Sequence, residues 1–499
     1  MRRYIPVVLL GMLGAFAGLV VVNYKGDAAN AEPPPSSANK DDKKSKDGSG
    51  ASGAVAAATA APTPALARPM RTIALGWEFL APGVVANADT PKPADKPADK
   101  PADKAKGSVA EKPADAPKPA PAIETTYANA TSMDEIESAL AKGGAAGGAD
   151  IAIMPLSSYV ASYERLRALS PELIFVVGWS RGREALYGAD ARAITKLPAT
   201  GTIKVAAASA QPETFFTLFL LDLAGVPASR VELVAKDAKT PLTAVFRRSK
   251  DAPKGKLLVT SADMPHVMPI VAVAPHGFVQ AHAADLELWG RTWLSGVTKL
   301  QADVPAGGRQ VATLAGAPPV LSIIEGLGQI EFATLRENAT AMGLSGRGAF
   351  TLDLAFRTTW RIWRDIGVLT TPPPEMAPLY TGIIGSLART SPEATAPDAP
   401  RVRTADAATG KRPEVLLVVK GPIAKAGKLD AEAFVNQIGF LAGVFDRLRL
   451  RVSIANDAKT AELLAQMARD RFGLRADQLS VAKQVPGGAS SAVEVLSPN

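Results

Sequence analysis

The sequence predicts an α/β protein with a small additional domain near its C-terminal end. From residue 123 to about 275, apolar runs typical of buried strands alternate with segments that have the apolar spacing of helices. The same alternation returns over residues 413–499. Strands that alternate with helices form parallel α/β units. The remaining stretches are rich in Ala, Pro, Lys and Asp, so we expect long linkers beside two folded regions.

Residues 1–25 have the pattern of an export signal or a membrane anchor. Arg2 and Arg3 precede residues 5–22, which are uncharged and mostly apolar. An apolar run of this length is near the minimum for a membrane span. We therefore expect an uncleaved anchor in the inner membrane, with the bulk of the chain in the periplasm because the basic end stays inside. The alternative is a signal peptide that is cleaved near the "ANA" of residues 29–31.

Three segments have compositions that cannot bury a core. Residues 26–70 are rich in Ala, Pro, Ser, Lys and Gly, and they predict a disordered tether. Residues 88–122 include three copies of "PADK" and predict a disordered insertion. Residues 386–412 predict a linker ahead of the last domain.

The individual elements are predicted from the spacing of the apolar residues and from the residues that typically begin or end a helix or strand. Strands are expected at 71–80, 123–128, 149–155, 172–179, 202–209, 230–236, 256–263 and 268–275. Helices are expected at 131–143, capped by Thr131 or Ser132, at 158–169 and 212–226, and across most of 280–369, ending with 352–369. The last domain is expected to be a β-α-β-α-β unit with elements at 413–421, 431–447, 448–456, 460–474 and 479–486.

Composition and motif content exclude several classes of function. The net charge is +8, but Lys and Arg are scattered or lie in Lys/Asp repeats, so no nucleic-acid partner is expected. The absence of cysteine excludes disulfides and thiolate metal sites. His266, His276 and His282 are spaced ten and six residues apart, which predicts no metal site. No phosphate-binding glycine motif is present, so no nucleotide cofactor is expected.

The stretch "IFVVGWSRG" at 174–182 offers two interpretations. Gly178-x-Ser180-x-Gly182 after a strand is the pattern of a nucleophile elbow, which predicts a serine esterase using Ser180. An acid from Asp222, Asp237 or Asp263 and one of the three histidines would then complete the triad. The favoured interpretation is a binding turn in which Ser180 donates a hydrogen bond and Arg181 or Arg183 neutralises an anionic group.

Five stretches in order resemble the type II periplasmic solute-binding proteins of ABC importers, in the nitrate, sulfonate and thiamine-precursor-like group. These stretches are "IALGWEF", "SMDEIESALAKGGAAGGADIAIMPLSSYV", "TIKVAAASAQPETFFTLFLLDLAGVPASRVELV", "LLVTSADMPHVMPIVAVAPHGFVQAHAADLELWGRTWLSGV" and "AFRTTWRIWRDIGVLTTPPP". The resemblance implies two α/β lobes over residues 71–385 that close on a small-molecule ligand by a hinge, with an ABC permease as partner and no cofactor. The candidate ligand-binding residues, at or near strand ends, are Trp77, Ser157, Ser180, Arg181, Arg183 and Ser209.

Residues 413–499 are similar to the OmpA-like peptidoglycan-binding fold, which is fused to such binding domains in an unusual subgroup. Where that family carries its ligand-binding loop and arginine, this chain has only Asn456 and Asp457, and no matching arginine follows. Peptidoglycan binding is therefore doubtful, and a structural role is expected for this domain.

Two departures from the binding-protein pattern affect the cleft. The first lobe carries the insertion at 88–122, and residues 237–255 replace a helix and a strand of the second lobe. The sequence thus favours a membrane-tethered solute-binding protein and no enzyme. Two alternatives to this function stay open: the serine esterase that uses Ser180, and an envelope scaffold with a degenerate cleft. In the favoured interpretation, residues 178–182 form a loop close to the hinge at the cleft, where two glycines let the backbone approach a ligand.

Overall fold

The computed structural model describes most of the two α/β regions and of the last domain. The described residues are 65–88, 123–235, 239–247, 255–345, 350–391, 414–424, 428–445, 448–482, 485 and 489–496. The predicted anchor at 1–25, and most of the predicted tether, insertion and linker, lie outside them. Among the described residues, no helix is both long and apolar enough to cross a membrane.

The first lobe is built on a six-stranded sheet with the order β11-β4-β10-β3-β1-β2. The strands β1, β2 and β3 run parallel, and β10 lies antiparallel between β3 and β4. The strand bounds are β1 (Met70–Ala74), β2 (Thr125–Asn129), β3 (Ile151–Pro155), β4 (Pro171–Ser180), β10 (Pro269–Pro275) and β11 (Ile330–Phe332). The central strands β3, β4 and β10 are almost wholly buried, as their continuous apolar runs predict for a sheet covered on both faces.

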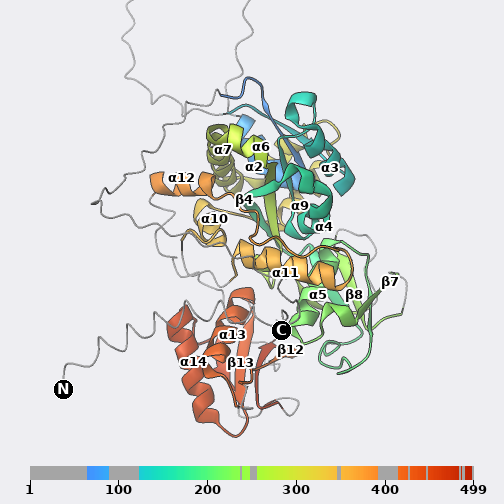
Figure 1. Cartoon of the computed structure of the whole chain (residues 1–499), viewed down its shortest axis with the longest axis vertical. Helices are drawn as coiled ribbons and strands as arrows, with labels where there is room; N and C mark the ends of the chain where they lie inside the picture. The colour runs from blue at the N-terminus through green and yellow to red at the C-terminus, as the bar shows by residue number, and fades with distance from the viewer. Residues whose placement is uncertain are drawn as a thin grey trace, which may run out of the picture. The chain divides into compact units, whose positions relative to one another are not determined.

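Helices cover this sheet on both sides (Figure 1). The N-cap of α3 is Ser132, which was one of the two residues predicted for this position. Its Oγ accepts a hydrogen bond from the N–H of Glu135. The helices of this lobe are α2 (Ala81–Ala88), α3 (Met133–Lys142), α4 (Leu156–Leu166), α6 (His276–Ala281), α7 (Ala283–Ala302), α8 (Val304–Val311), α9 (Val320–Leu327), α10 (Leu335–Ala341) and α12 (Gly382–Thr390). The helix α12 extends past the predicted boundary at residue 385.

The second lobe is built on a five-stranded sheet with the order β7-β6-β8-β5-β9, packed on α5 (Pro212–Leu223). Its strands are β5 (Glu184–Gly188), β6 (Ile203–Ala206), β7 (Val231–Val234), β8 (Leu242–Phe246) and β9 (Lys256–Thr260). Two of these differ from expectation. Neither β5 nor β8 was among the strands expected from the sequence, although each pairs with strands on both of its sides.

The chain passes between the two sheets at residues 181–183 and returns at residues 261–268. The predicted two-lobe α/β fold is therefore confirmed, and "GWSRG" lies at the first crossing. Gly182 has a φ of +87°, which favours glycine. Gly178 also has a packing role, because a Cβ there would clash with the carbonyl oxygen of Glu331 in β11. Its missing side chain allows that strand to pair.

The helix α11 (Leu352–Asp365) contacts both lobes. The indole Nε1 of Trp363 donates a 2.9 Å hydrogen bond to the carbonyl oxygen of Ser157 in α4 of the first lobe. The guanidinium of Arg361 donates two hydrogen bonds, of 2.9 and 2.6 Å, to the carboxylate of Asp222 in α5 of the second lobe. This helix therefore links the two lobes in addition to the two crossings.

The last domain contains the predicted β-α-β-α-β unit and one further strand. Its sheet has the order β12-β15-β13-β14. The elements are β12 (Val415–Lys420), α13 (Ala431–Val444), β13 (Arg449–Ile454), α14 (Ala458–Phe472), β14 (Leu479–Val481) and β15 (Ser491–Leu496). The strand β15 was not expected, and it inserts between β12 and β13, antiparallel to both.

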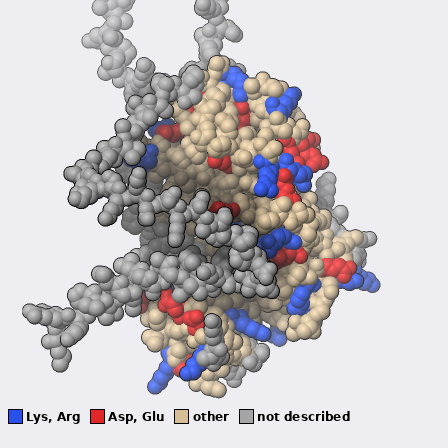
Figure 2. Space-filling view, in the orientation of Figure 1, with Lys and Arg blue, Asp and Glu red and all other residues tan. Residues whose placement is uncertain are grey.

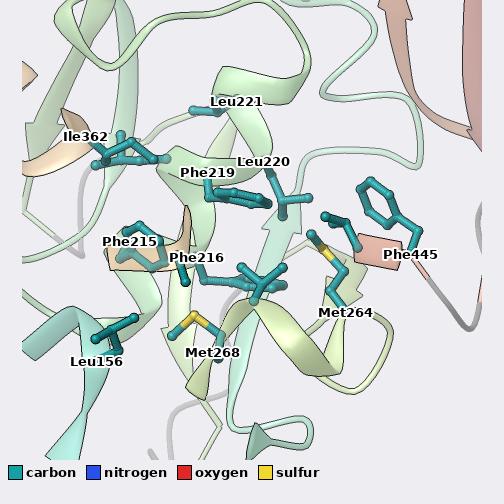
Figure 3. Packing of buried hydrophobic residues seen from close by; sticks show 14 of the residues in the cluster. Leu156, Phe215, Phe216, Phe219, Leu220, Leu221, Met264, Met268, Ile362 and Phe445 are labelled. Atoms are coloured by element: carbon teal, nitrogen blue, oxygen red, sulfur yellow. The ribbon is translucent and has the colours of Figure 1, made fainter. Parts of the chain in front are cut away.

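The buried apolar side chains of the second lobe and of the last domain belong to one continuous cluster. Figure 3 shows Phe215, Phe216, Phe219 and Leu220 of α5 in this cluster, with Met264 of the return crossing and Phe445 at the end of α13 close by. On the face drawn in Figure 2, basic and acidic side chains are interspersed.

Candidate functional site

A cavity of about 750 Å³ lies where the two lobes meet. Ligand pockets of this kind commonly measure about 300–1,000 Å³. The first lobe lines it with Leu75, Gly76, Glu78, Phe79, Ala130, Thr131, Ser132, Met133, Pro155, Ser158, Ser180 and Ile270. The two crossings and the second lobe line it with Arg183, Met268, Glu184, Ala210, Gln211, Pro212, Glu213 and Phe246.

Topology places this cavity at the carboxyl ends of β1, β2 and β3. The lining residues of the first lobe come largely from the points where these parallel strands end and the helical segments η1 (Trp77–Leu80), α3 and α4 begin. The carboxyl ends of parallel strands meet at one edge of a sheet, where α/β proteins commonly bind ligands. The N-terminal end of α5 lines the cavity from the second lobe.

The charge pair between Arg183 and Glu78 joins the two sides of the cavity. The Nη1 atom of Arg183 lies 2.9 Å from Oε1 of Glu78, and both side chains are buried. The guanidinium also lies over the ring of Phe79, 4.5 Å from its centroid, and over that of Phe246, at 5.0 Å. An Arg charge held by a carboxylate and two aromatic rings is already balanced within the protein.

Ser180, Glu184 and Ser261 form a buried hydrogen-bonded group at the two crossings. Ser180 Oγ donates to the carboxylate of Glu184 and lies 3.1 Å from Ser261 Oγ. The N–H of Gly182 donates to Ser261 Oγ at 2.8 Å. Burial raises the pKa of Glu184 above its usual value, although the charge of Arg183 and the two serine hydroxyls oppose this rise.

Two of the six predicted ligand-binding residues line the cavity, namely Ser180 and Arg183. Trp77 and Ser157 are not among its lining residues, but Glu78 and Ser158, which follow them in sequence, are. The side chain of Trp77 lies beside Gly316, and Ser157 accepts the hydrogen bond of Trp363 with its carbonyl oxygen.

Arg181 and Ser209 also lie outside the lining of the cavity. Arg181 is exposed, and its backbone N–H donates to the carbonyl oxygen of Gln329 at 2.8 Å. Ser209 is exposed in the turn before α5, whereas the next residue, Ala210, lines the cavity.

Sequence reasoning missed the carboxylates Glu78, Glu184 and Glu213 and the rings of Phe79 and Phe246. A signal existed for Glu78 and Phe79, since "GWEF" was identified as the opening of the first lobe. No local signal placed Glu184 or Phe246 there, because both depend on the pairing of β5 with β8.

The surroundings of Ser180 differ from those of a nucleophile elbow. Ser180 ends β4 and is followed by a turn and another strand, β5, instead of a helix. Its hydroxyl contacts Glu184 and Ser261. The three histidines have other neighbours: His266 lies edge-on to Trp179, His276 contacts Glu172 and His282 contacts Asp285. Within the described residues, no group of three or more histidine or acidic side chains is placed to hold a metal ion.

No family model matches the chain, and no curated protein matches it. Several solved structures are similar to it. The Candida albicans CA3427 gene product, described as having the generic periplasmic binding protein fold, is 10% identical, with coverage of 65% of this chain and 95% of that chain and a TM-score of 0.38. The aliphatic sulphonate binding protein SsuA from Escherichia coli is 10% identical, with coverage of 61% and 92% and a TM-score of 0.38. The nitrate-binding protein NrtA from Synechocystis PCC 6803 is 11% identical, with coverage of 52% and 69% and a TM-score of 0.32.

Proposed function

We propose that this chain is an extracytoplasmic solute-binding protein that captures a small molecule between its two lobes, for an ABC-type importer or for sensing. The observation that carries the proposal is the cavity of about 750 Å³ at the junction of the lobes, with lining residues from both. Hydroxyl and amide groups of Thr131, Ser158 and Gln211 supply hydrogen bonds, and Met133, Met268 and Ile270 supply apolar walls.

The connections between the lobes support binding by closure. The two crossings at 181–183 and 261–268 are short and adjacent, as the hydrogen bond between Ser180 and Ser261 indicates. Two short adjacent connections permit rotation of one lobe against the other while they limit sliding. A ligand that contacts both lobes would favour the closed arrangement.

Thermal unfolding of the full chain with a panel of small solutes tests this proposal. A bound solute raises the free energy of unfolding by about 2.7 kcal/mol at a hundred times its Kd. Gln211→Trp, at an exposed lining position, should abolish the shift, and Gln280→Trp, exposed on α6, should leave it intact. If no solute shifts the transition, the proposal is wrong and the scaffold alternative gains support.

We place the protein in the periplasm, tethered to the inner membrane through residues 1–25. Support comes from the sequence alone, namely the two arginines ahead of an apolar run near the length of a membrane span. Fractionation of cells that express the full chain tests the tether. Recovery of the chain with the inner membrane supports it, and recovery in the soluble periplasmic fraction contradicts it.

For the last domain we propose an OmpA-like origin and a structural role. The side chain that stands near the family's ligand loop, Asp457, is used as a helix cap. Its Oδ1 accepts from the N–H of Thr460 at 2.9 Å, and its Oδ2 accepts from the hydroxyl of Thr460 at 2.6 Å. A sedimentation assay with isolated peptidoglycan tests this, and co-sedimentation of the full chain would contradict it.

A further inference from the structure

The guanidinium of Arg183 contacts aromatic rings that belong to different lobes. Its Cζ atom lies 4.5 Å from the ring centroid of Phe79, in η1 of the first lobe. The same atom lies 5.0 Å from the ring centroid of Phe246, at the end of β8 in the second lobe. The Nη1 atom is also 2.9 Å from Oε1 of Glu78, again in η1. One side chain therefore touches both walls of the cavity.

The backbone of Arg183 is fixed to the second lobe. Its carbonyl oxygen accepts a 2.7 Å hydrogen bond from the N–H of Arg247, directly after β8. The next residue, Glu184, begins β5 and is the direct partner of Phe246 in the antiparallel pairing of β5 with β8. The side chain of Arg183 thus starts on the second lobe and ends on the first.

Glu78 and Phe79 are in turn fixed to the first lobe. They lie in η1, which follows β1 after a short turn. The N–H of Gly76 in this turn donates a 3.0 Å hydrogen bond to Oδ1 of Asn129, at the end of β2. A rotation that parts the lobes must therefore carry Glu78 away from Arg183.

The contact between Arg183 and Glu78 is shielded from water. The exposed fractions of the two residues are 6% and 2%. Charges in such surroundings attract each other strongly because water screens them little. By contrast, Arg361 of α11 and Asp222 of the second lobe have side chains that are 45% and 22% exposed, and such pairs contribute little. Of these two ion pairs, that of Arg183 is the stronger restraint on the second lobe.

We propose that Arg183 is a built-in latch, which holds the two lobes together around the cavity when no solute is bound. When the lobes part, the charges of Arg183 and Glu78 separate and become hydrated, so opening leaves neither charge buried without a partner. The closed arrangement then predominates in the empty protein, and a solute enters during brief release of the latch. This inference goes beyond the proposed function, because it concerns the protein without solute.

The distance between spin labels on the two lobes tests the latch. The chain contains no cysteine, so Ser138→Cys in α3 and Ala235→Cys just after β7 create one pair of labelling sites. Both positions are exposed, and neither lines the cavity. Double electron–electron resonance on the full chain, without added solute, gives the distribution of distances between the lobes. For the parent we expect a single narrow distribution.

Arg183→Met retains an apolar side chain and removes the charge. We expect this variant to broaden the distribution and to add a population at longer distance. Arg181→Met is the matched control, two residues earlier at an exposed position outside the lining, and should keep the distribution of the parent. If Arg183→Met fails to fold because Glu78 has lost its partner, Glu78→Gln combined with Arg183→Met removes both charges and provides the same test.

Three outcomes would overturn the latch. The first is a distribution in the Arg183 variant, or in the double variant that replaces it, that matches the parent. The second is a parent that already shows the broad distribution, and the third is an equal change in Arg181→Met. Each leaves the proposed function intact, because lobes can close on a solute without a latch. Failure of every solute to bind would overturn the proposed function alone, since the latch is measured in the empty protein.

Discussion

Ser180 and Ser261 lie 3.1 Å apart, Oγ to Oγ, at the two points where the chain passes between the lobes. They come from opposite ends of the second lobe in sequence, one before β5 and one after β9. Ser261 also accepts from the N–H of Gly182 at 2.8 Å, and its own N–H donates to the carbonyl oxygen of Glu184 at 2.9 Å. The two crossings are thus held together by one buried hydroxyl and the backbone around it.

Ser261→Ala should destabilise the chain by about 1–3 kcal/mol, because it leaves the buried N–H of Gly182 without that acceptor. Urea unfolding followed by tryptophan fluorescence measures the change. Ser209→Ala, at an exposed position, is the control and should lie within about 0.5 kcal/mol of the parent. Equal stabilities of the two variants would show that the serine hydroxyl contributes nothing to the crossing.

Glu78→Gln should cost about 3–5 kcal/mol, since it leaves the buried charge of Arg183 without its carboxylate. The double variant Glu78→Gln with Arg183→Met should be destabilised by clearly less than the sum of the single variants. Unfolding of all four proteins in urea completes the double-mutant cycle. Additive effects would mean that the two residues do not interact energetically.

Glu164 links α4 to the segment after α11, and it should make the free energy of unfolding depend on pH in the acidic range. The hydroxyl and N–H of Thr371, with smaller contributions from Thr370, lower the pKa of Glu164 to about 2 from its usual 4.5. A lowered native pKa stabilises the fold above about pH 4.5, and this contribution is lost as pH falls toward about 2. Because Glu164 is only half-buried and solvent screens its charge, the effect should stay below about 1 kcal/mol. Glu164→Gln should reduce the slope of unfolding free energy against pH in that window, and an identical slope would count against the contact.

Trp363 of α11 should be among the most sensitive core positions. It is fully buried, its ring centroid is 5.9 Å from that of Phe215 in α5, and its Nε1 reaches Ser157 in α4. Trp363→Ala should cost about 3–5 kcal/mol through the cavity that it creates. Trp363→Phe keeps much of the apolar contact and should cost less. Equal losses in the two variants would mean that the hydrogen bond to Ser157 dominates instead of the packing.

The parts of the fold that were predicted have local causes. The strands β3 and β10 are continuous apolar runs ended by proline, and α3 begins at a serine followed three residues later by glutamate. The strand β5 was not predicted, because its pairing with β8 and β9 is set by contacts between segments that lie far apart in the sequence.

The residues of the candidate site also fall into two groups, those with a local signal in the sequence and those without one. Ser180 and Arg183 were identified because they follow a strand end directly. Glu184 and Phe246 reach the cavity only through the antiparallel pairing of β5 and β8, in which these two residues are direct partners. Pairing over such a sequence distance is set by tertiary packing, for which a single sequence contains no local signal.

The return crossing has the cavity on one side and the last domain on the other. Met268 lines the cavity, while Met264, four residues earlier in the same segment, is buried in one apolar cluster with Phe445 of the last domain (Figure 3). The last domain therefore packs directly on the segment through which the chain returns to the first lobe. The backbone path of residues 261–268 is constrained by three bodies, the two lobes and this domain, instead of by the lobes alone.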